Sequence, residues 1–408
     1  MTRIVKNPWA VVIGWALTRT IIAAMGLEHL PYYGNDVLYN DLDVYSRWTN
    51  DIAAGHFPVG DDLWQYPPLA APVIYASRLF GEGRAAFVAL ALVVDFLILV
   101  VLLVDGHRRE RVQGAWLWVL AAGLVGPLLL GRFDLVPTLF AVLAVVWVSR
   151  PIRSGVASAL GALLKVWPVL MLLAIPRRSL PPALAAFVIV SFNVLLIAGA
   201  WSSGGLSFLG NQRSRGIQEE SVAALPFVIA RAFGAHIEYI YRFGSVEVEA
   251  AGANTAGAVV TVIGLLLISL VAWWRLRGRL EAVGAPDVAL TVVLISVATS
   301  RVFSPQYDVW LLALGALCLA DERSRLRIPV LMIAIASICA QLIYPWLYGP
   351  LNSGAPNATI LQSVRIVLIV GATLMALLKI RSRGTRRESG RHSALLRDDD
   401  QDFASVRI

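Results

Sequence analysis

Long apolar runs, separated by short polar and basic stretches, dominate the pattern along the chain. A helix needs about 20 predominantly apolar residues to cross a bilayer, so these runs predict membrane-spanning helices. The expected spans are residues 8–27, 84–105, 114–130, 135–149, 181–201, 255–274, 286–300, 306–320, 328–345 and 359–379. With the pair of half-helices described next, they predict an all-α polytopic membrane protein of about 12 membrane segments.

Two further apolar runs do not fit a simple crossing. Residues 67–80 are too short to span and are expected on the outer interface. Residues 155–175 hold Lys165 inside the apolar run, followed by Pro168, and proline breaks a helix because it has no backbone N–H to donate. We therefore predict two half-helices that meet near Lys165 and have both ends in the cytoplasm. With this arrangement, every later basic loop lies on the cytoplasmic side.

Basic loops favour the cytoplasmic side of a membrane, and this preference sets the orientation of the chain. Lys6 places the N-terminus in the cytoplasm. Residues 28–83 and 202–254 are then long extracytoplasmic segments. Residues 1–380 are predicted to form one transmembrane domain, and the polar residues 381–408 a disordered cytoplasmic tail.

Composition supports the membrane assignment. The 408-residue chain is 58% hydrophobic and 15% charged, against roughly 25% charged residues in soluble domains. The net charge of +8 does not indicate nucleic-acid binding, because the Arg residues cluster in short loops between apolar runs. Cys318 and Cys339 lie in predicted spans, which favours neither a disulfide framework nor a metal cluster. We expect a multi-pass protein of the plasma membrane.

The segment from Asp41 to Pro68 follows the first span and is rich in carboxylates and aromatic rings. It includes a predicted short amphipathic helix over residues 43–54. Its carboxylate and aromatic residues include Asp41, Asp43, Asp51, Asp61, Asp62, Tyr45, Trp48, Trp64 and Tyr66. A carboxylate in such a loop suits a general base.

Charged residues also gather at the predicted outer leaflet, where charges are costly and therefore candidates for function. They are Arg132, Asp134, Lys165, Arg213, Arg215, Glu219, Glu220 and Arg301. Cationic side chains of this kind suit a phosphate group. Structural alternatives stay open, because Arg132 and Asp134 can form an ion pair at a turn and Lys165 can extend to the interface.

Six short motifs occur in one order along the chain: D-L-D-V-Y at 41–45, Y-P-P-L at 66–69, G-R-F-D-L-V-P at 131–137, K-V-W-P at 165–168, R-S-R-G-I-Q-E-E-S at 213–221 and F-S-P-Q-Y at 303–307. Together they resemble family 87 glycosyltransferases of the GT-C superfamily. The resemblance covers residues 10–380. It implies a transmembrane catalytic domain, a polyprenyl-phosphate sugar donor, usually polyprenyl-phosphate mannose, and inverting transfer to a glycolipid on the extracytoplasmic face.

A strong bias for Arg over Lys suggests a GC-rich genome. With the motifs, this bias fits an actinobacterial α-mannosyltransferase, such as one that extends phosphatidylinositol mannosides through α-1,2 linkages. The partners implied are the lipid-linked donor, the glycolipid acceptor and the bilayer, with no nucleic acid.

The resemblance also implies a role for each matching residue. The first Asp of the D-L-x-V-Y pattern maps onto Asp41 as the general base, and Asp43 is a rival on the D-x-D spacing. Arg132, Lys165 and Arg301 are expected to bind the donor phosphate. The other substrate-binding residues are expected to be Tyr45, Trp64, Tyr66, Asp134, Arg213, Arg215, Glu219, Gln306 and Tyr307. The scheme requires no metal or other cofactor.

Two other functions stay open at this point. Within the same class, the transferred sugar could be arabinofuranose or another sugar. Outside it, the chain could be a transporter or flippase for a lipid-linked sugar. The sequence shows no evident internal repeat, and many transporter folds are built from such repeats.

Overall fold

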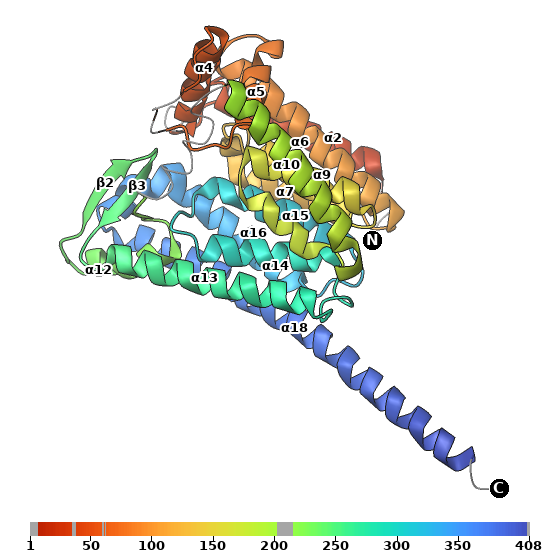
Figure 1. Ribbon diagram of the computed structural model, residues 1–408. Coiled ribbons are helices and arrows are strands. Elements are labelled where there is room, and N and C mark those ends of the chain that lie inside the picture. Colours follow the sequence, from red (N-terminus) through yellow and green to blue (C-terminus); the bar gives the residue numbers. More distant parts are fainter. Residues whose placement is uncertain (1–6, 35–37, 59–60, 62, 202–214, 406–408) are drawn as a thin grey trace.

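The computed structural model of the protein describes all residues except 1–6, 35–37, 59–60, 62, 202–214 and 406–408. Arg213 of the predicted site lies outside the described residues, as do Lys6 and Asp62. Helices dominate the fold (Figure 1). The longer ones are α2 (Pro8–Gly26), α4 (Asn40–Ala53), α6 (Gly83–Arg108), α7 (Gln113–Val125), α8 (Leu135–Val146), α9 (Pro151–Leu164), α10 (Leu180–Trp201), α13 (Ala253–Leu276), α14 (Ala285–Ala298), α15 (Asp308–Ala320), α16 (Arg327–Gln341) and α18 (Pro356–Ser405).

Shorter helical elements connect these helices. They are α5 (Ala70–Tyr75), η1 (Ala76–Phe80), η2 (Gly126–Leu129), η3 (Trp167–Ala174), η4 (Arg177–Ser179), η5 (Val222–Ala224), α12 (Leu225–Ala232), η6 (Pro305–Tyr307), η7 (Leu342–Leu347) and α17 (Tyr348–Asn352). α4 confirms the amphipathic helix predicted after the first span. The apolar run 67–80 forms only α5 and η1, as its short length predicted.

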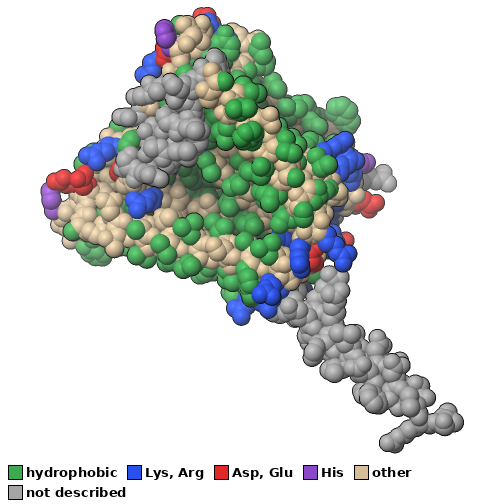
Figure 2. Space-filling model, viewed as in Figure 1, with side chains coloured by type: hydrophobic (Ala, Val, Ile, Leu, Met, Phe, Trp, Pro, Cys, Tyr) green, Lys and Arg blue, Asp and Glu red, His purple; other side chains and the backbone are tan. Residues whose placement is uncertain are grey.

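Among the described residues, six helical segments are long and apolar enough to cross a membrane. They are Pro8–Gly26, Gly83–Arg108, Arg177–Ala200, Ala253–Leu276, Arg327–Asn352 and Pro356–Ser382. In Figure 2, hydrophobic side chains cover α10 and α13, and Lys and Arg side chains gather toward the end from which α18 projects. The chain is therefore a mainly helical, multi-pass membrane protein. The total of about 12 segments and their sidedness stay predictions.

The expected break after α9 is present in the structure. Lys165 has an extended backbone (φ −157°, ψ 128°), and the 3₁₀ helix η3 begins at Trp167. Pro168 cannot donate a backbone hydrogen bond, so α9 cannot continue through it. The carbonyl of Leu163, in the last turn of α9, instead accepts a hydrogen bond from the N–H of Leu69 at 3.2 Å. The break thereby attaches the segment after α4 to the bundle.

A small sheet departs from the all-α prediction. Strands β1 (Ile217–Gln218), β2 (Glu238–Arg242) and β3 (Ser245–Glu249) are antiparallel and lie in the order β1-β3-β2. β2 and β3 form a hairpin whose turn residues, Phe243 and Gly244, both have positive φ, as the commonest two-residue hairpin turn requires. These strands are short and polar, so a search for long apolar runs passes over them.

A buried ion pair joins helices within the bundle. Arg19 of α2 and Asp95 of α6 are 1% and 0% exposed, and Arg19 Nε lies 2.8 Å from Asp95 Oδ2. Arg19 also donates to the backbone carbonyls of Trp118 and Val119 of α7. Asp95 is thus hydrogen-bonded within the bundle. Removing either partner of a buried pair typically costs about 3–5 kcal/mol, so we assign Arg19 and Asp95 a structural role.

The last helix, α18, continues beyond the bundle. It runs from Pro356 to Ser405, and its C-terminal part projects away from the other helices (Figure 1). The sequence predicts a disordered tail from Arg381, whereas the backbone there is helical. Many of the tail residues, such as Arg, Glu, Ala and Leu, have good helix propensity. The division between a transmembrane domain (1–380) and a cytoplasmic tail (381–408) stays a prediction.

The predicted sidedness of α9 and η3 can be tested by cysteine labelling. Arg153 and Arg178 flank the half-helix pair and are exposed. In a background without Cys318 and Cys339, we expect Arg153→Cys and Arg178→Cys to react with an impermeant maleimide only from the cytoplasmic face. Tyr33→Cys, on the predicted outer side, should react from outside. Labelling of Arg178→Cys from outside would contradict the half-helix topology.

Candidate active site

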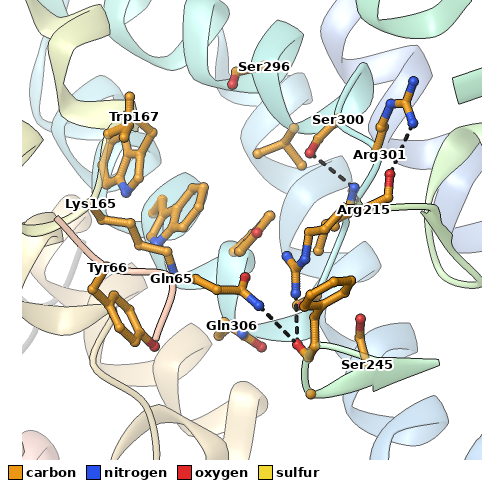
Figure 3. Close-up of a pocket in the computed structure, with 18 of the residues that line it drawn as sticks. Gln65, Tyr66, Lys165, Trp167, Arg215, Ser245, Ser296, Ser300, Arg301 and Gln306 are labelled. Carbon is orange, nitrogen blue, oxygen red and sulfur yellow. Dashed lines mark hydrogen bonds between the residues drawn. The ribbon is translucent and has the colours of Figure 1, made fainter. Parts of the chain in front are cut away.

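A cavity of about 700 Å³ opens beside α4. Its walls come from α4, residues 63–67, the break between α9 and η3, the β2–β3 turn, α13, α14 and residues 300–310. Figure 3 shows Lys165 on one side, and Arg215 and Arg301 on the other. The predicted site residues that line the cavity are Asp41, Tyr45, Tyr66, Lys165, Arg215, Arg301, Gln306 and Tyr307. Segments far apart in the sequence thus meet in one place.

Asp41 lies in the first turn of α4 and faces the cavity. Tyr45, four residues later, lies on the same face and also lines the cavity. Asp43 is rotated by about 200° around the helix axis. It pairs with Arg84, whose Nη2 lies 2.7 Å from Asp43 Oδ2. The Arg84 guanidinium holds the pKa of Asp43 below its usual range, so the helical period directs only Asp41 toward the cavity.

The guanidinium of Arg132 holds the Asp41 carboxylate in place. Its Nε lies 3.2 Å from Asp41 Oδ2. Its Nη1 donates to the carbonyls of Leu38 and Gly131 at 2.6 and 3.1 Å, and Nη2 lies 3.5 Å from Tyr344 Oη. Arg132 is 7% exposed and does not line the cavity. The sequence predicts that Arg132 binds the donor phosphate. Its contacts in the structure instead favour a role in positioning the Asp41 carboxylate.

Lys165 lies at the break with its ammonium group beside the cavity. Its Nζ is 2.7 Å from Asp134 Oδ1, and the same oxygen accepts a hydrogen bond from Trp310 Nε1 at 2.7 Å. Asp134 does not line the cavity and is buried behind Lys165. Nζ also lies 5.1–5.9 Å from the ring centroids of Tyr66, Tyr307 and Trp310. Because Asp134 compensates its charge, Lys165 offers the cavity hydrogen-bond donors rather than an unpaired cation.

Stacked aromatic rings support this side of the cavity. The Trp310 ring stacks on Trp167 and on Tyr307, with centroid separations of 4.8 and 4.0 Å. Tyr307 and Trp310 are three residues apart at the start of α15, which places them on one face. On α4 and the following loop, the hydroxyl oxygens of Tyr45 and Tyr66 lie 2.9 Å apart. These side chains present ring faces and hydroxyl groups to a ligand.

Two guanidinium groups lie across the cavity from Lys165 (Figure 3). Arg301 Nη1 donates to the carbonyl of Arg215 at 3.0 Å, and Arg215 Nη2 donates to the carbonyl of Phe243 at 2.8 Å. Within the described part of the chain, neither arginine has a carboxylate partner, and Arg215 Nε is buried without a hydrogen-bond partner. Unlike Lys165, these groups keep uncompensated charge, which suits a phosphate.

A buried network fixes the backbone that carries Arg301. The N–H of Gln218 donates to the carbonyl of Arg301 at 2.9 Å, and Gln218 Oε1 accepts from the N–H of Phe303 at 2.9 Å. Gln218 Nε2 donates to Glu220 Oε2, and Glu220 Oε1 accepts from Arg365 Nη1 at 2.8 Å. Thus β1 and α18 hold the segment that presents Arg301.

One wall of the cavity is apolar. It includes Leu265 and Ile268 of α13 and Val297 of α14. α13 and α14 approach closely at Gly264, where an added Cβ would lie 2.1 Å from Thr299 Oγ1. Since the outer surface of α13 is itself apolar (Figure 2), this wall suits a lipid chain next to the cationic pair.

Besides Asp134, two predicted substrate-binding residues do not line the cavity. Trp64 is 1% exposed and packs on Trp48 and Tyr66, with ring centroids 4.9 and 5.9 Å apart, so it supports the lining from behind. Glu219 is 0% exposed. Burial and the nearby Glu220 raise the pKa of Glu219 to about 9, so its carboxyl group is neutral at pH 7.

Several lining residues were not predicted from the sequence. They include Gln65, Trp167, Ser245, Ser300 and Trp310. Trp310 follows Tyr307 by one helical turn, and Gln65 immediately precedes the Y-P-P-L motif, so helical spacing and motif context could have indicated both. Nothing in the sequence indicated that the β2–β3 turn would reach the cavity.

The model of glycosyltransferase family 87 matches residues 64–305. The chain belongs to glycosyltransferase family 87. The matched range covers more than half of the chain and includes Lys165, Arg215 and Arg301, while Asp41 precedes it. No curated protein matches the chain. The family establishes that the protein is a glycosyltransferase, which requires a sugar donor and an acceptor.

The cavity of this family 87 glycosyltransferase presents a carboxylate on one element and, on others, arginines that have no carboxylate partner among the described residues. Among the residues that the structure describes, no group of three or more His, Cys, Asp or Glu side chains could hold a metal ion. In the cavity, the Asp41 carboxylate is a group that can accept a proton, and the Arg215 and Arg301 guanidinium groups can stabilise negative charge.

Proposed function

We propose that the protein transfers mannose from polyprenyl-phosphate mannose to a mannosylated lipid of the phosphatidylinositol mannoside or lipomannan type, forming an α-1,2 linkage. The transfer takes place on the extracytoplasmic side of the plasma membrane. One observation carries the proposal: Asp41, the uncompensated pair Arg215 and Arg301, and an apolar wall share one cavity. Sugar transfer from a lipid-phosphate donor requires a base for the acceptor hydroxyl, a site for the donor phosphate and an apolar surface for the lipid chain. The choice of mannose rests on the resemblance of the six motifs.

The reaction is a single displacement at the anomeric carbon of the donor. Asp41 accepts the proton of the acceptor hydroxyl while its oxygen forms the new bond to C1, as in the general-base step of inverting glycoside chemistry. The bond between C1 and the phosphate oxygen breaks, and its electron pair stays on the phosphate. Arg215 and Arg301 stabilise that added charge, so no acid has to protonate the leaving group.

The remaining lining residues orient the donor sugar. Lys165 donates hydrogen bonds to sugar hydroxyls while Asp134 keeps its charge compensated. The ring stack of Tyr307 and Trp310 supports the apolar face of the sugar. Gln306 and Tyr66 add hydrogen-bonding groups at the same cavity. Orientation of this kind lowers the entropic part of the barrier.

The proposal is tested with purified protein, labelled polyprenyl-phosphate mannose and phosphatidylinositol mannosides. We expect equimolar release of polyprenyl phosphate and formation of an α-1,2-mannosylated lipid. GDP-mannose should not replace the lipid donor, and polyprenyl-phosphate arabinofuranose tests the choice of sugar. Movement of intact donor across liposome bilayers without any sugar transfer would instead favour a transporter and contradict the proposal.

A further inference from the structure

A second cavity, of about 540 Å³, lies beside the β2–β3 hairpin. Ser245 lines the active-site cavity and the next residue, Val246, lines this outer cavity. Successive side chains of a strand point to opposite faces, so the two cavities are neighbours across β3. Strand β2 lines the outer cavity from Glu238 to Tyr241. The outer cavity is also lined by Arg231, His236, Tyr239, Tyr241 and Asn352.

We infer that the outer cavity binds sugar units of the acceptor beyond the one that receives the transferred residue. The inference rests on the proposed function, because it takes the acceptor to be a glycan and gives that glycan a second point of attachment.

The chemistry of the outer cavity suits a carbohydrate. Tyr239 and Tyr241 alternate along β2 and lie on one face, beside the guanidinium of Arg231, which is 5.0 Å from the Tyr239 ring centroid. In the described part of the chain, the Tyr239 hydroxyl is buried and has no hydrogen-bond partner. A buried polar group without a partner is costly, and a sugar hydroxyl would satisfy it. The aromatic ring faces suit the apolar face of a sugar ring, and the hydrogen-bonding groups suit its hydroxyl groups.

The same cavity is poorly suited to an anion. Arg231 Nε donates to the carbonyl of Asn352 at 2.7 Å, and its Nη1 donates to the carbonyl of Ile237. The side-chain amide of Asn352 lies against the carboxyl group of Glu219. Glu238 also lines the cavity and adds a carboxylate at its rim. Two of the five Arg231 N–H groups are therefore occupied within the protein. Together with the Glu238 carboxylate, this makes a neutral polyol a better fit than a phosphate.

A chain of polar side chains connects Asp41 to the outer cavity. Asp41 pairs with Arg132, and Arg132 Nη2 lies 3.5 Å from Tyr344 Oη. The rings of Tyr344 and Tyr348 meet edge to face with centroids 5.2 Å apart. The Tyr348 hydroxyl donates to Glu219, whose other partner is the Asn352 amide of the outer cavity. Arg132 and Glu219 are buried and line neither cavity, so this chain of contacts couples Asp41 to the outer cavity through the interior of the protein.

The proposed donor site leaves room for the acceptor. Arg215, Arg301 and the apolar wall bind the donor, and the part of the active-site cavity beside Asp41 remains for the acceptor. Strand β2 runs from Tyr239 at the outer cavity to the Phe243 turn at the active-site cavity, which is about 13 Å for four residues. That span exceeds one sugar ring and suits an oligosaccharide.

The test compares acceptors of different length. Octyl α-mannoside and octyl α-mannotrioside are supplied with polyprenyl-phosphate mannose. For the trioside, we expect kcat/KM to fall about threefold to tenfold in Tyr239→Phe, the loss of one hydrogen bond between neutral groups, and further in Tyr241→Ala. For the monoside, kcat/KM should stay within about twofold, and the KM for the donor should not change.

Tyr33→Phe is the matched control, because Tyr33 is 78% exposed and does not line either cavity. It should use both acceptors like the wild type. Equal losses on both acceptors in Tyr239→Phe and Tyr241→Ala, or unchanged use of the trioside in both, would overturn the assignment of the outer cavity. Failure of the wild type to transfer mannose to any mannoside would instead overturn the proposed function.

Discussion

Replacing Asp41 by Asn is expected to lower turnover at least about 100-fold, the usual minimum contribution of a general base. Asn keeps the size and hydrogen bonding of Asp41 but cannot accept the proton of the acceptor hydroxyl. Asp41 faces the cavity and is fixed by Arg132 through one carboxylate oxygen at 3.2 Å. Donor binding should be preserved, since the donor phosphate is bound elsewhere. Initial transfer rates at saturating donor, with a separate donor-binding assay, measure both quantities.

Asp43→Asn is the matched control for Asp41→Asn. Asp43 lies two residues away on the same helix but pairs with Arg84 and does not line the cavity. Turnover should therefore change only slightly. The assignment fails if the two variants rank the other way. It also fails if Asp41→Asn protein is folded, binds donor and transfers mannose at nearly the wild-type rate.

Replacing Arg301 or Arg215 by Ala is expected to weaken donor binding about 30-fold or more. Truncating one partner of a buried charge pair costs about 2–5 kcal/mol, and about 1.4 kcal/mol corresponds to a factor of ten. Both guanidinium groups lack a carboxylate partner among the described residues, so their interaction with the phosphate is not offset by an existing pair. The apparent KM for polyprenyl-phosphate mannose measures the effect, and the KM for the acceptor should change little.

Arg78→Ala controls for the loss of an arginine in the predicted extracytoplasmic segment 28–83. Arg78 pairs with Glu82 and does not line the active-site cavity. Its donor KM should equal that of the wild type. Lys165→Ala is a less selective probe, since it also leaves Asp134 buried without its ion-pair partner. An unchanged donor KM in both Arg215→Ala and Arg301→Ala would exclude this pair from the phosphate site.

Local features of the site follow from the sequence. The i, i+4 spacing of Asp41 and Tyr45 on a helix places both on one face and turns Asp43 away. Pro168 inside an apolar run predicts the break at which Lys165 lies. The apolar runs predict a multi-pass helical protein, because a span depends on the length and composition of one segment alone. Each of these inferences involves only a few turns of chain.

Tertiary structure decided which charges remain available to a ligand. The sequence groups Arg132, Lys165 and Arg301 as equivalent cations, yet Arg132 binds Asp41 and Lys165 binds Asp134. Arg215 and Arg301, 86 residues apart, meet with neither of them paired to a carboxylate in the described part of the chain. The small sheet and its outer cavity likewise depend on pairing between separate segments. Sequence periodicity fixes which way a side chain points on its own helix, but the partner it reaches depends on how the helices pack against one another.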